Sequence, residues 1–183
     1  MLDRIETSPP RLTLVLGGAR SGKSRHAEAL IEGWSDEALY FATAEPRDDE
    51  MRARIARHRA RRGARWTTIE EPLALTPILR AHARRGRPVL VDCLTLWLSN
   101  LLEAGRQVAS EIDALIAALP LLEGPVVLVA NEVGLGIVPE NRLAREFRDH
   151  AGRLNQEVAA IGDHVVFLAA GLPLVLKAQG SRA

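Results

Sequence analysis

The sequence contains a single cysteine, Cys93, so the chain cannot form an internal disulfide. A disulfide-stabilised secreted scaffold is therefore excluded, and a reducing, cytoplasmic environment is expected. No uninterrupted apolar run reaches the roughly 20 residues that a membrane-spanning helix needs. Met1–Pro10 combines charges with two prolines, which does not match a signal peptide. We therefore expect a cytoplasmic protein that does not span a membrane.

The chain also has little net charge and few aromatic residues. Its 24 basic and 23 acidic residues leave a formal charge of +1, so no field of the whole molecule favours nucleic acid. A length of 183 residues suits one compact domain. No repeat or linker divides it, and residues 1–10 and 181–183 are expected to be loose ends.

What the sequence does contain is an alternation of strand and helix patterns. This alternation predicts an α/β fold with a mostly parallel central sheet and crossover helices. The expected strands are Leu12–Leu16, Ala38–Ala44, Trp66–Ile69, Val89–Asp92, Val126–Ala130 and His164–Ala169, with Leu172–Leu176 as a further candidate. The expected helical regions are Lys23–Gly33, Asp48–Arg62, Leu73–Arg85, Leu94–Leu119 with a break near Gly105, and Pro139–Ile161.

A complete P-loop motif joins the first expected strand to the first helix. It consists of Gly17, Gly18, Ala19, Arg20, Ser21, Gly22, Lys23 and Ser24. The glycines allow backbone N–H groups to surround a phosphate chain, and the helix directs its positive end at the same anion. Lys23 is predicted to reach the β- and γ-phosphates, and Ser24 to ligate Mg²⁺. The motif therefore predicts nucleoside triphosphate binding.

Two carboxylates follow expected strands downstream of this motif. Asp92 ends Val89–Asp92, where it can hold Mg²⁺ directly or through water. The alternative is that Asp92 only caps the next helix. Glu132 arrives at the same sheet edge, and the sequence leaves its part in the site open.

The segment Asp48–Arg65 carries seven arginines around His58. Such a run is usually a solvated basic face. It could also bind nucleic-acid phosphate, although stacking aromatics are missing apart from Trp66. The third interpretation is a nucleotide site in which neighbouring arginines keep the imidazole of His58 neutral and nucleophilic. Spacing alone leaves these alternatives open.

Two further features have open interpretations. The segment Asn131–Pro139 is either a plain turn before a helix or a substrate loop at the crevice. Cys93 is interpreted as a small buried hydrophobe rather than a reactive thiol. His26, just beyond the P-loop, is interpreted as a helix-packing residue rather than a nucleotide contact. His82, His150 and His164 have no acidic or cysteine partners at metal-ligand spacing.

Four segments together resemble one known family over about Leu12–Lys177. They are the P-loop, Tyr40–Ala44, Asp48–Arg59 and Asn131–Arg145, and the last two carry the specific part of the match. The chain resembles the bifunctional adenosylcobinamide kinase / adenosylcobinamide-phosphate guanylyltransferase family of cobalamin biosynthesis.

The resemblance implies a RecA-like P-loop NTPase domain that assembles as a homotrimer, and two reactions. In the first, the γ-phosphoryl group of ATP or GTP moves to the aminopropanol hydroxyl of adenosylcobinamide. In the second, GTP guanylylates a histidine, and the GMP passes to adenosylcobinamide phosphate to give adenosylcobinamide-GDP.

The resemblance also assigns residues. The guanylylated histidine falls on His58, whereas Arg57 stands where some members have a second histidine. The implied nucleotide contacts are the P-loop and Thr43, Ala44, Glu45, Arg59, Ala60, Arg61, Arg62, Glu70 and Asp92. Two other functions remain possible at this point: a small-molecule kinase without nucleotidyl transfer, and a RecA-like module that binds nucleic acid through the arginine run.

Overall fold

The computed structural model describes residues 8–46 and 48–178; of residues 50, 51, 54, 58 and 61, which lie in a helix, it describes only the backbone. Of the expected loose ends, residues 1–7 and 181–183 lie outside the described residues. The strands are β1 (Leu12–Gly17), β2 (Ala38–Ala42), β3 (Trp66–Glu70), β4 (Val89–Asp92), β5 (Val126–Asn131), β6 (His164–Ala169) and β7 (Leu172–Lys177). The helices are α1 (Lys23–Glu32), α2 (Asp49–Arg61), α3 (Leu75–His82), α4 (Leu94–Glu103), α5 (Val108–Ala118) and α6 (Arg142–Ile161), with a short 3₁₀ turn η1 (Leu119–Leu121).

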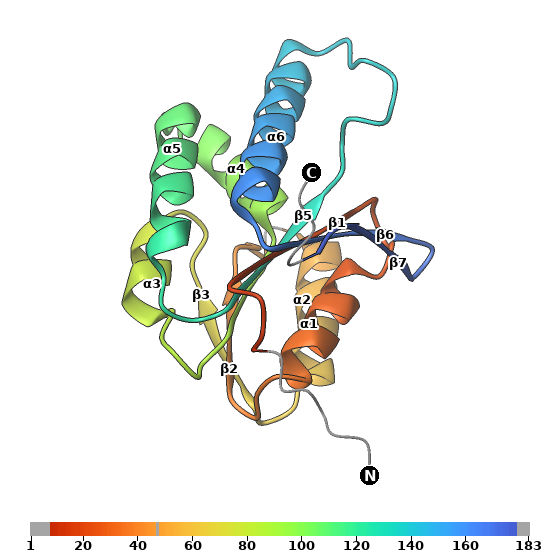
Figure 1. The fold of residues 1–183 in the computed structure, drawn as a ribbon. Helices are drawn as coiled ribbons and strands as arrows, with labels where there is room; N and C mark the ends of the chain where they lie inside the picture. Colours follow the sequence, from red (N-terminus) through yellow and green to blue (C-terminus); the bar gives the residue numbers. More distant parts are fainter. Residues whose placement is uncertain (1–7, 47, 179–183) are drawn as a thin grey trace.

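The strands form one seven-stranded sheet with the order β3-β2-β4-β5-β1-β6-β7 (Figure 1). All neighbouring strands are parallel except β6 and β7, which form an antiparallel hairpin. The expected α/β fold with a mostly parallel sheet is therefore confirmed. Strand β5 lies between β1 and β4, so the strand before the P-loop and the strand ending in Asp92 are not direct neighbours.

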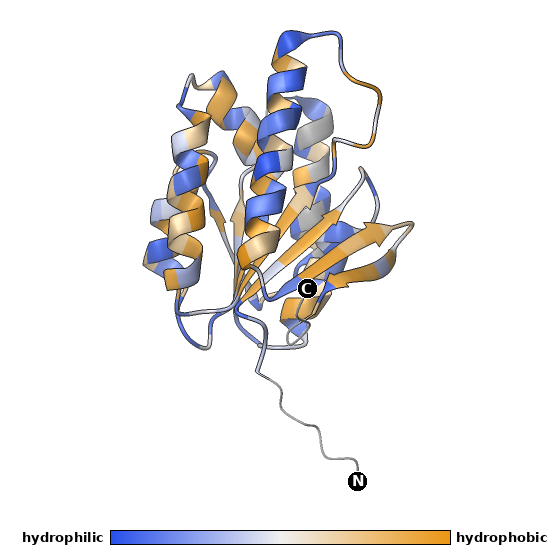
Figure 2. Cartoon of the chain, turned by 45° about the horizontal axis from the view of Figure 1, so that its top comes forward, coloured by the Kyte–Doolittle hydropathy of each residue, from blue (hydrophilic) through white to orange (hydrophobic). Residues whose placement is uncertain are grey.

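Helices cover both faces of the sheet. Helices α3, α4, α5 and α6 pack on one face, where Trp97, Leu98 and Leu154 belong to the larger hydrophobic core. Helix α1 packs on the other face, where Ala27 and Ile31 meet Val129 and other strand residues. Figure 2 shows hydrophobic strands between helices that turn polar sides outward. We call the second face the α1 face.

Two expected helices were too long. Helix α3 covers Leu75–His82 rather than Leu73–Arg85. The Glu71 side chain accepts hydrogen bonds from the N–H groups of Leu73 and Ala74, so these residues form a turn before the helix. Helix α6 begins at Arg142, not at Pro139, because the Asn141 side chain accepts from the N–H groups of Leu143 and Ala144 and caps the helix.

Strand and break positions differ by smaller amounts. Strand β2 ends at Ala42, two residues before the expected Ala44, and β1 and β3 each extend one residue further. The break expected near Gly105 is present, since that residue has φ of 65° between α4 and α5. Among the described residues no helix is both long and apolar enough to cross a membrane.

Candidate functional site

The loop between β1 and α1 uses the backbone freedom of its glycines. Gly22 caps α1 with φ of 100°, and Arg20 has φ of 56°. Lys23 is buried, and its Nζ donates a hydrogen bond to the Gly18 carbonyl oxygen at 2.6 Å. The loop therefore closes around its own lysine at the positive end of a helix, an arrangement suited to binding phosphate.

The C-terminal hairpin supports this loop. The N–H group of Gly171, between β6 and β7, donates to the carbonyl oxygen of Ser21 at 2.9 Å. A Cβ on Gly17 would lie 2.4 Å from the carbonyl oxygen of Leu168, so a side chain does not fit there. A Cβ on Gly18 would meet no protein atom within 4 Å. Packing within the protein therefore requires glycine at position 17, whereas the space beside Gly18 is open.

A cavity of about 530 Å³ lies next to the loop, at the carboxyl ends of β2, β3, β4 and β5. Among the residues expected in the site, Arg20, Ser21, Gly22, Lys23, Ser24, Ala44, Arg59, Arg62, Glu70 and Asp92 line it. The lining also includes Tyr40, Ala42, Arg57 and Asn131. Residues from six separate segments of the sequence thus meet in one place, as the crevice rule for open α/β sheets predicts.

Among the other expected residues whose side chains the structure describes, none lines this cavity. Gly17, Gly18 and Ala19 belong to the loop but not to the wall, Thr43 is buried, and Glu45 and Ala60 are exposed. The side chains of His58 and Arg61 lie outside the described residues, and only their place on α2 is described.

Tyr40 and Asp92 face the cavity from adjacent strands. The Tyr40 hydroxyl donates a hydrogen bond to Oδ2 of Asp92 at 2.7 Å. Burial, followed by the nearby Asp92 carboxylate, raises the pKa of the Tyr40 hydroxyl far above its usual value. The phenol therefore stays protonated and remains a donor, and it fixes one oxygen of the carboxylate.

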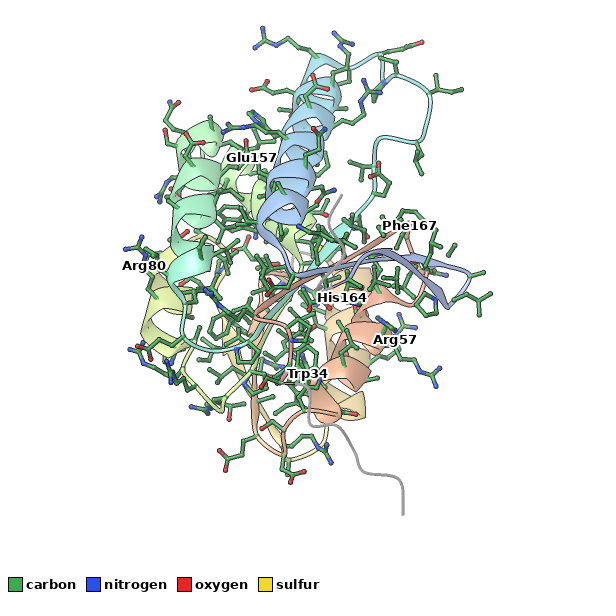
Figure 3. All side chains as sticks on the ribbon, in the orientation of Figure 1. Trp34, Arg57, Arg80, Glu157, His164 and Phe167 are labelled. Carbon is green, nitrogen blue, oxygen red and sulfur yellow. The ribbon has the colours of Figure 1, made fainter. Side chains whose placement is uncertain are left out.

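Helix α2, which carries His58, is attached to the sheet by Arg59 and by Arg62, which directly follows the helix. The guanidinium carbon of Arg62 lies 3.3 Å from the centre of the Tyr40 ring, a cation–π contact. Arg59 forms an ion pair with Glu70 at the end of β3. Arg57 projects from the same side of the sheet (Figure 3). The arginine run is therefore not only a solvated face, because at least three of its members line the cavity.

Hydrogen bonds between Thr43 and Cys93 connect the residues that directly follow β2 and β4. Thr43 Oγ1 accepts a hydrogen bond from the Cys93 N–H group and donates one to its carbonyl oxygen, both at 2.8 Å. Asn100 donates to the Thr43 carbonyl oxygen at 2.8 Å. Burial raises the pKa of the Cys93 thiol. Cys93 is thus a buried free cysteine, as expected, and Thr43 is a supporting residue in this structure.

The segment from Asn131 to Pro139 leaves the sheet at the same edge. The N–H group of Glu132 donates to the Gly17 carbonyl oxygen at 3.0 Å, and its carboxylate accepts from the N–H group of Gly134. Glu132 is not part of the cavity wall. Leu135 and Ile137, further along, are 83% and 96% exposed. Glu132 therefore shapes this loop, and the loop presents apolar side chains to solvent.

A second, more open depression lies on α6. In its wall, Arg153 forms ion pairs with Glu157, also in the wall, and with Asp113 of α5. Figure 3 shows Glu157 on the opposite side of the sheet from Arg57. Among the described residues, no cluster of three or more His, Cys, Asp or Glu side chains could hold a metal ion by itself. The cavity beside the P-loop is therefore the candidate active site.

Comparison with known proteins identifies the family of this chain. The family described as cobinamide kinase / cobinamide phosphate guanyltransferase matches residues 13–176. The chain belongs to this family. The bifunctional adenosylcobalamin biosynthesis protein CobP of Pseudomonas aeruginosa is 51% identical over 168 residues, covering 91% of this chain and 97% of that protein. The bifunctional protein CobU of Escherichia coli K12 is 46% identical over 181 residues, covering 91% and 99%.

Solved structures of low identity show the same fold. A type III secretion system ATPase aligns with a TM-score of 0.56 at 14% identity and covers 90% of this chain. The P4 protein of bacteriophage phi6, solved with ADP, aligns with a TM-score of 0.50 at 16% identity and covers 94% of this chain. This chain spans 56% of each of those chains. This chain therefore has the same fold as these two proteins.

Tyr40 and Asn131 are among the cavity residues that the sequence did not predict. Tyr40 was noted only as part of a matching segment, and Asn131 only as the first residue of a loop. Strand alternation contained the signal for both. Within β2 and β5 they occupy positions of the same parity as residues that face α1, such as Ala38 and Val129.

Proposed function

We propose that this protein is a bifunctional adenosylcobinamide kinase and adenosylcobinamide-phosphate guanylyltransferase. It phosphorylates the aminopropanol hydroxyl of adenosylcobinamide with ATP or GTP. It then transfers GMP from GTP, through a guanylylated His58, to adenosylcobinamide phosphate. The observation that carries the proposal is the single cavity that joins a P-loop, the Asp92 carboxylate and arginines of the helix bearing His58, in a chain of this family.

The residues of the cavity suit phosphoryl chemistry. Lys23 and the α1 N-terminus supply positive charge for the phosphates. Ser24 and Asp92 both line the cavity and offer oxygen ligands, the kind that Mg²⁺ prefers, so these two residues would hold the ion together with phosphate oxygens. Mg²⁺ bound there would neutralise charge on the triphosphate. The Tyr40 hydroxyl would keep the Asp92 carboxylate oriented.

The second reaction needs a nucleophile and a cationic environment for the α-phosphate. In our proposal the His58 imidazole nitrogen attacks the α-phosphorus, the bond to the bridging oxygen breaks, and pyrophosphate leaves. A phosphoramidate between His58 and GMP results, and this intermediate divides a difficult transfer into two displacements. Arg57, Arg59 and Arg62 line the cavity and would neutralise the phosphate under attack.

Incubation with GTP labelled at the α-phosphate tests this proposal. The wild-type protein should retain acid-labile label after denaturation, and the His58→Ala variant should not. His150→Ala is a matched control, because that histidine lies on α6 outside the cavity and its variant should be labelled like the wild type. Equal labelling of His58→Ala and wild type would refute the covalent role. Phosphorylated adenosylcobinamide without any labelled protein would instead indicate a plain kinase.

We also propose that the protein works in the cytoplasm as a homotrimer. The outer strand β7 supports an assembly, because Leu172, Leu174, Val175 and Leu176 are each more than half exposed. Apolar side chains on an exposed edge strand favour association with another chain over contact with water. Light scattering after size-exclusion chromatography measures the mass, and a monomer of 20.0 kDa at micromolar concentration would contradict the proposal.

A further inference from the structure

Asn131 lies on β5, the strand between β1, which leads into the P-loop, and β4, which ends in Asp92. It is the last residue of β5 and pairs in register with Gly17, where the P-loop begins. On the other side of β5 lies β4, which ends in Asp92. Because neighbouring strands are about 4.8 Å apart, Asn131 stands roughly one strand spacing from Gly17. Asp92 pairs with Val129, so Asn131 lies two residues beyond the partner of Asp92 on the same edge of the sheet.

The side chain of Asn131 belongs to the α1 face. Alternate residues of a strand share a face, and the preceding residues of that parity, Val127 and Val129, pack in the core beneath α1. Asn131 continues this series at the edge of the sheet and lines the same cavity as Lys23 and Asp92. It therefore presents a neutral amide where the terminal phosphate of a bound triphosphate would lie.

Buried polar residues hold the backbone at this position. The N–H group of Asn131 donates to Thr95 Oγ1 at 2.7 Å, and its carbonyl oxygen accepts a longer hydrogen bond from Asn155 at 3.5 Å. Thr95 and Asn155 are 7% and 8% exposed. The side-chain amide of Asn131 makes no hydrogen bond to any residue that the structure describes. Its backbone is thus fixed from α4 and α6, while its amide remains available to a ligand.

We propose that Asn131 is a catalytic residue of the kinase reaction, whose Nδ2–H group donates to an oxygen of the transferred phosphoryl group. This inference rests on the proposed function. The acceptor hydroxyl oxygen bonds to the γ-phosphorus, the bond from that phosphorus to the β–γ bridging oxygen breaks, and the nucleoside diphosphate leaves with the electron pair. The hydroxyl proton passes to water. The amide stabilises charge on the equatorial oxygens during this transfer.

The contact predicts a difference between the two reactions. Charge in phosphoryl transfer is redistributed at the γ-phosphorus, where Asn131 lies, so removal of the amide should lower kcat of that step about 100-fold or more. Guanylylation proceeds at the α-phosphorus, so GTP-dependent labelling of His58 should fall less than about 3-fold, the range of a ground-state contact. A residue that only maintains the fold would weaken both reactions together.

Three variants of the full-length protein test the proposal. Asn131→Ala should lose phosphorylation of adenosylcobinamide with little change in KM for the triphosphate. Asn131→Asp should lose at least as much, because a carboxylate of the same shape cannot donate and repels phosphate. Gln107→Ala, an amide removed from an exposed position at the start of α5, should match the wild type in both reactions.

A second measurement does not depend on turnover. The ³¹P resonances of a bound, non-hydrolysable ATP analogue with Mg²⁺ should differ between wild type and Asn131→Ala at the γ-phosphorus more than at the α-phosphorus. Kinase activity of Asn131→Asp near the wild-type level, or an unchanged γ-resonance in Asn131→Ala, would overturn the proposal. Wild-type protein that binds the analogue but phosphorylates nothing would refute the proposed kinase function, while the ³¹P comparison would still decide the contact.

Discussion

Replacing Gly18 by alanine should separate nucleotide binding from folding. A Cβ at position 18 meets no protein atom within 4 Å, and Gly18 is not among the glycines with positive φ. The unliganded variant should therefore be as stable as the wild type, or up to about 1 kcal/mol more stable, because alanine restricts the unfolded chain. If the open space receives phosphate, however, the same methyl group obstructs the ligand.

The expected effect can be calculated for thermal unfolding. GTP with Mg²⁺ at about 100 times its Kd adds about 2.7 kcal/mol to wild-type stability. At about 2–4 °C per kcal/mol for a domain of this size, Tm should rise by about 5–11 °C. A steric conflict of about 2.7 kcal/mol, within the range for an overpacked contact, lowers affinity about 100-fold. The rise in Tm would then shrink to about 1–2 °C.

Two further glycine variants make the assay decisive. Gly17→Ala places a Cβ 2.4 Å from the Leu168 carbonyl oxygen and should lower Tm of the unliganded protein by about 2–12 °C, since overpacking costs about 1–3 kcal/mol. Gly152→Ala on α6, where a Cβ has open space, is the control for a methyl group outside the cavity and should keep the full nucleotide-induced rise. A full rise in Gly18→Ala as well would refute the placement of phosphate beside Gly18.

Two other predictions concern single hydrogen bonds and titration. Tyr40→Phe removes the donor to Asp92 but keeps the aromatic ring. Urea unfolding should show a loss of about 1.5–3 kcal/mol in the free energy of unfolding, as for other hydrogen bonds to charged groups. An unchanged free energy of unfolding would show that water replaces the hydroxyl without loss. Burial lowers the pKa values of His26 and His164, and the proximity of His164 contributes to the shift of His26. The unfolded chain therefore binds more protons than the folded one below about pH 6.5, so stability should fall as the pH drops through this range. The urea midpoint of His164→Gln should change less than that of the wild type between about pH 7.5 and about pH 5.5. A change as large as in the wild type would contradict the role given to His164.

The sequence was sufficient to predict the elements and the P-loop, because these depend on local patterns. The strand ending in Asp92 and the loop around Lys23 are both present where their motifs indicated. Helix ends were predicted less well. The start of α6 depends on the hydrogen bonds that the Asn141 side chain accepts from the N–H groups of Leu143 and Ala144, and these bonds cannot be seen in the sequence. Pro139 alone gave a misleading start for α6.

The assembly of the cavity could not be predicted from local patterns. The hydrogen bond between Tyr40 and Asp92 depends on β2 lying beside β4, and the position of Asn131 depends on β5 lying between β1 and β4. Neither neighbour relation follows from the order of strands in the sequence. The sequence also did not predict that β7 runs antiparallel to β6. This direction results from the turn at Ala170 and Gly171, which both have positive φ.

The position of β1 between β5 and β6 has a consequence for synthesis of the chain. Leu12 pairs with Val126 of β5 and Thr13 with His164 of β6, so the strand that leaves the ribosome first finds its partners last. Until those segments emerge, an apolar strand with two unpaired edges is open to association with other chains. The phosphate loop is also completed late, because Gly171 supplies one of its hydrogen bonds. Nucleotide can therefore rescue a destabilised full-length chain, but it cannot assist the nascent one.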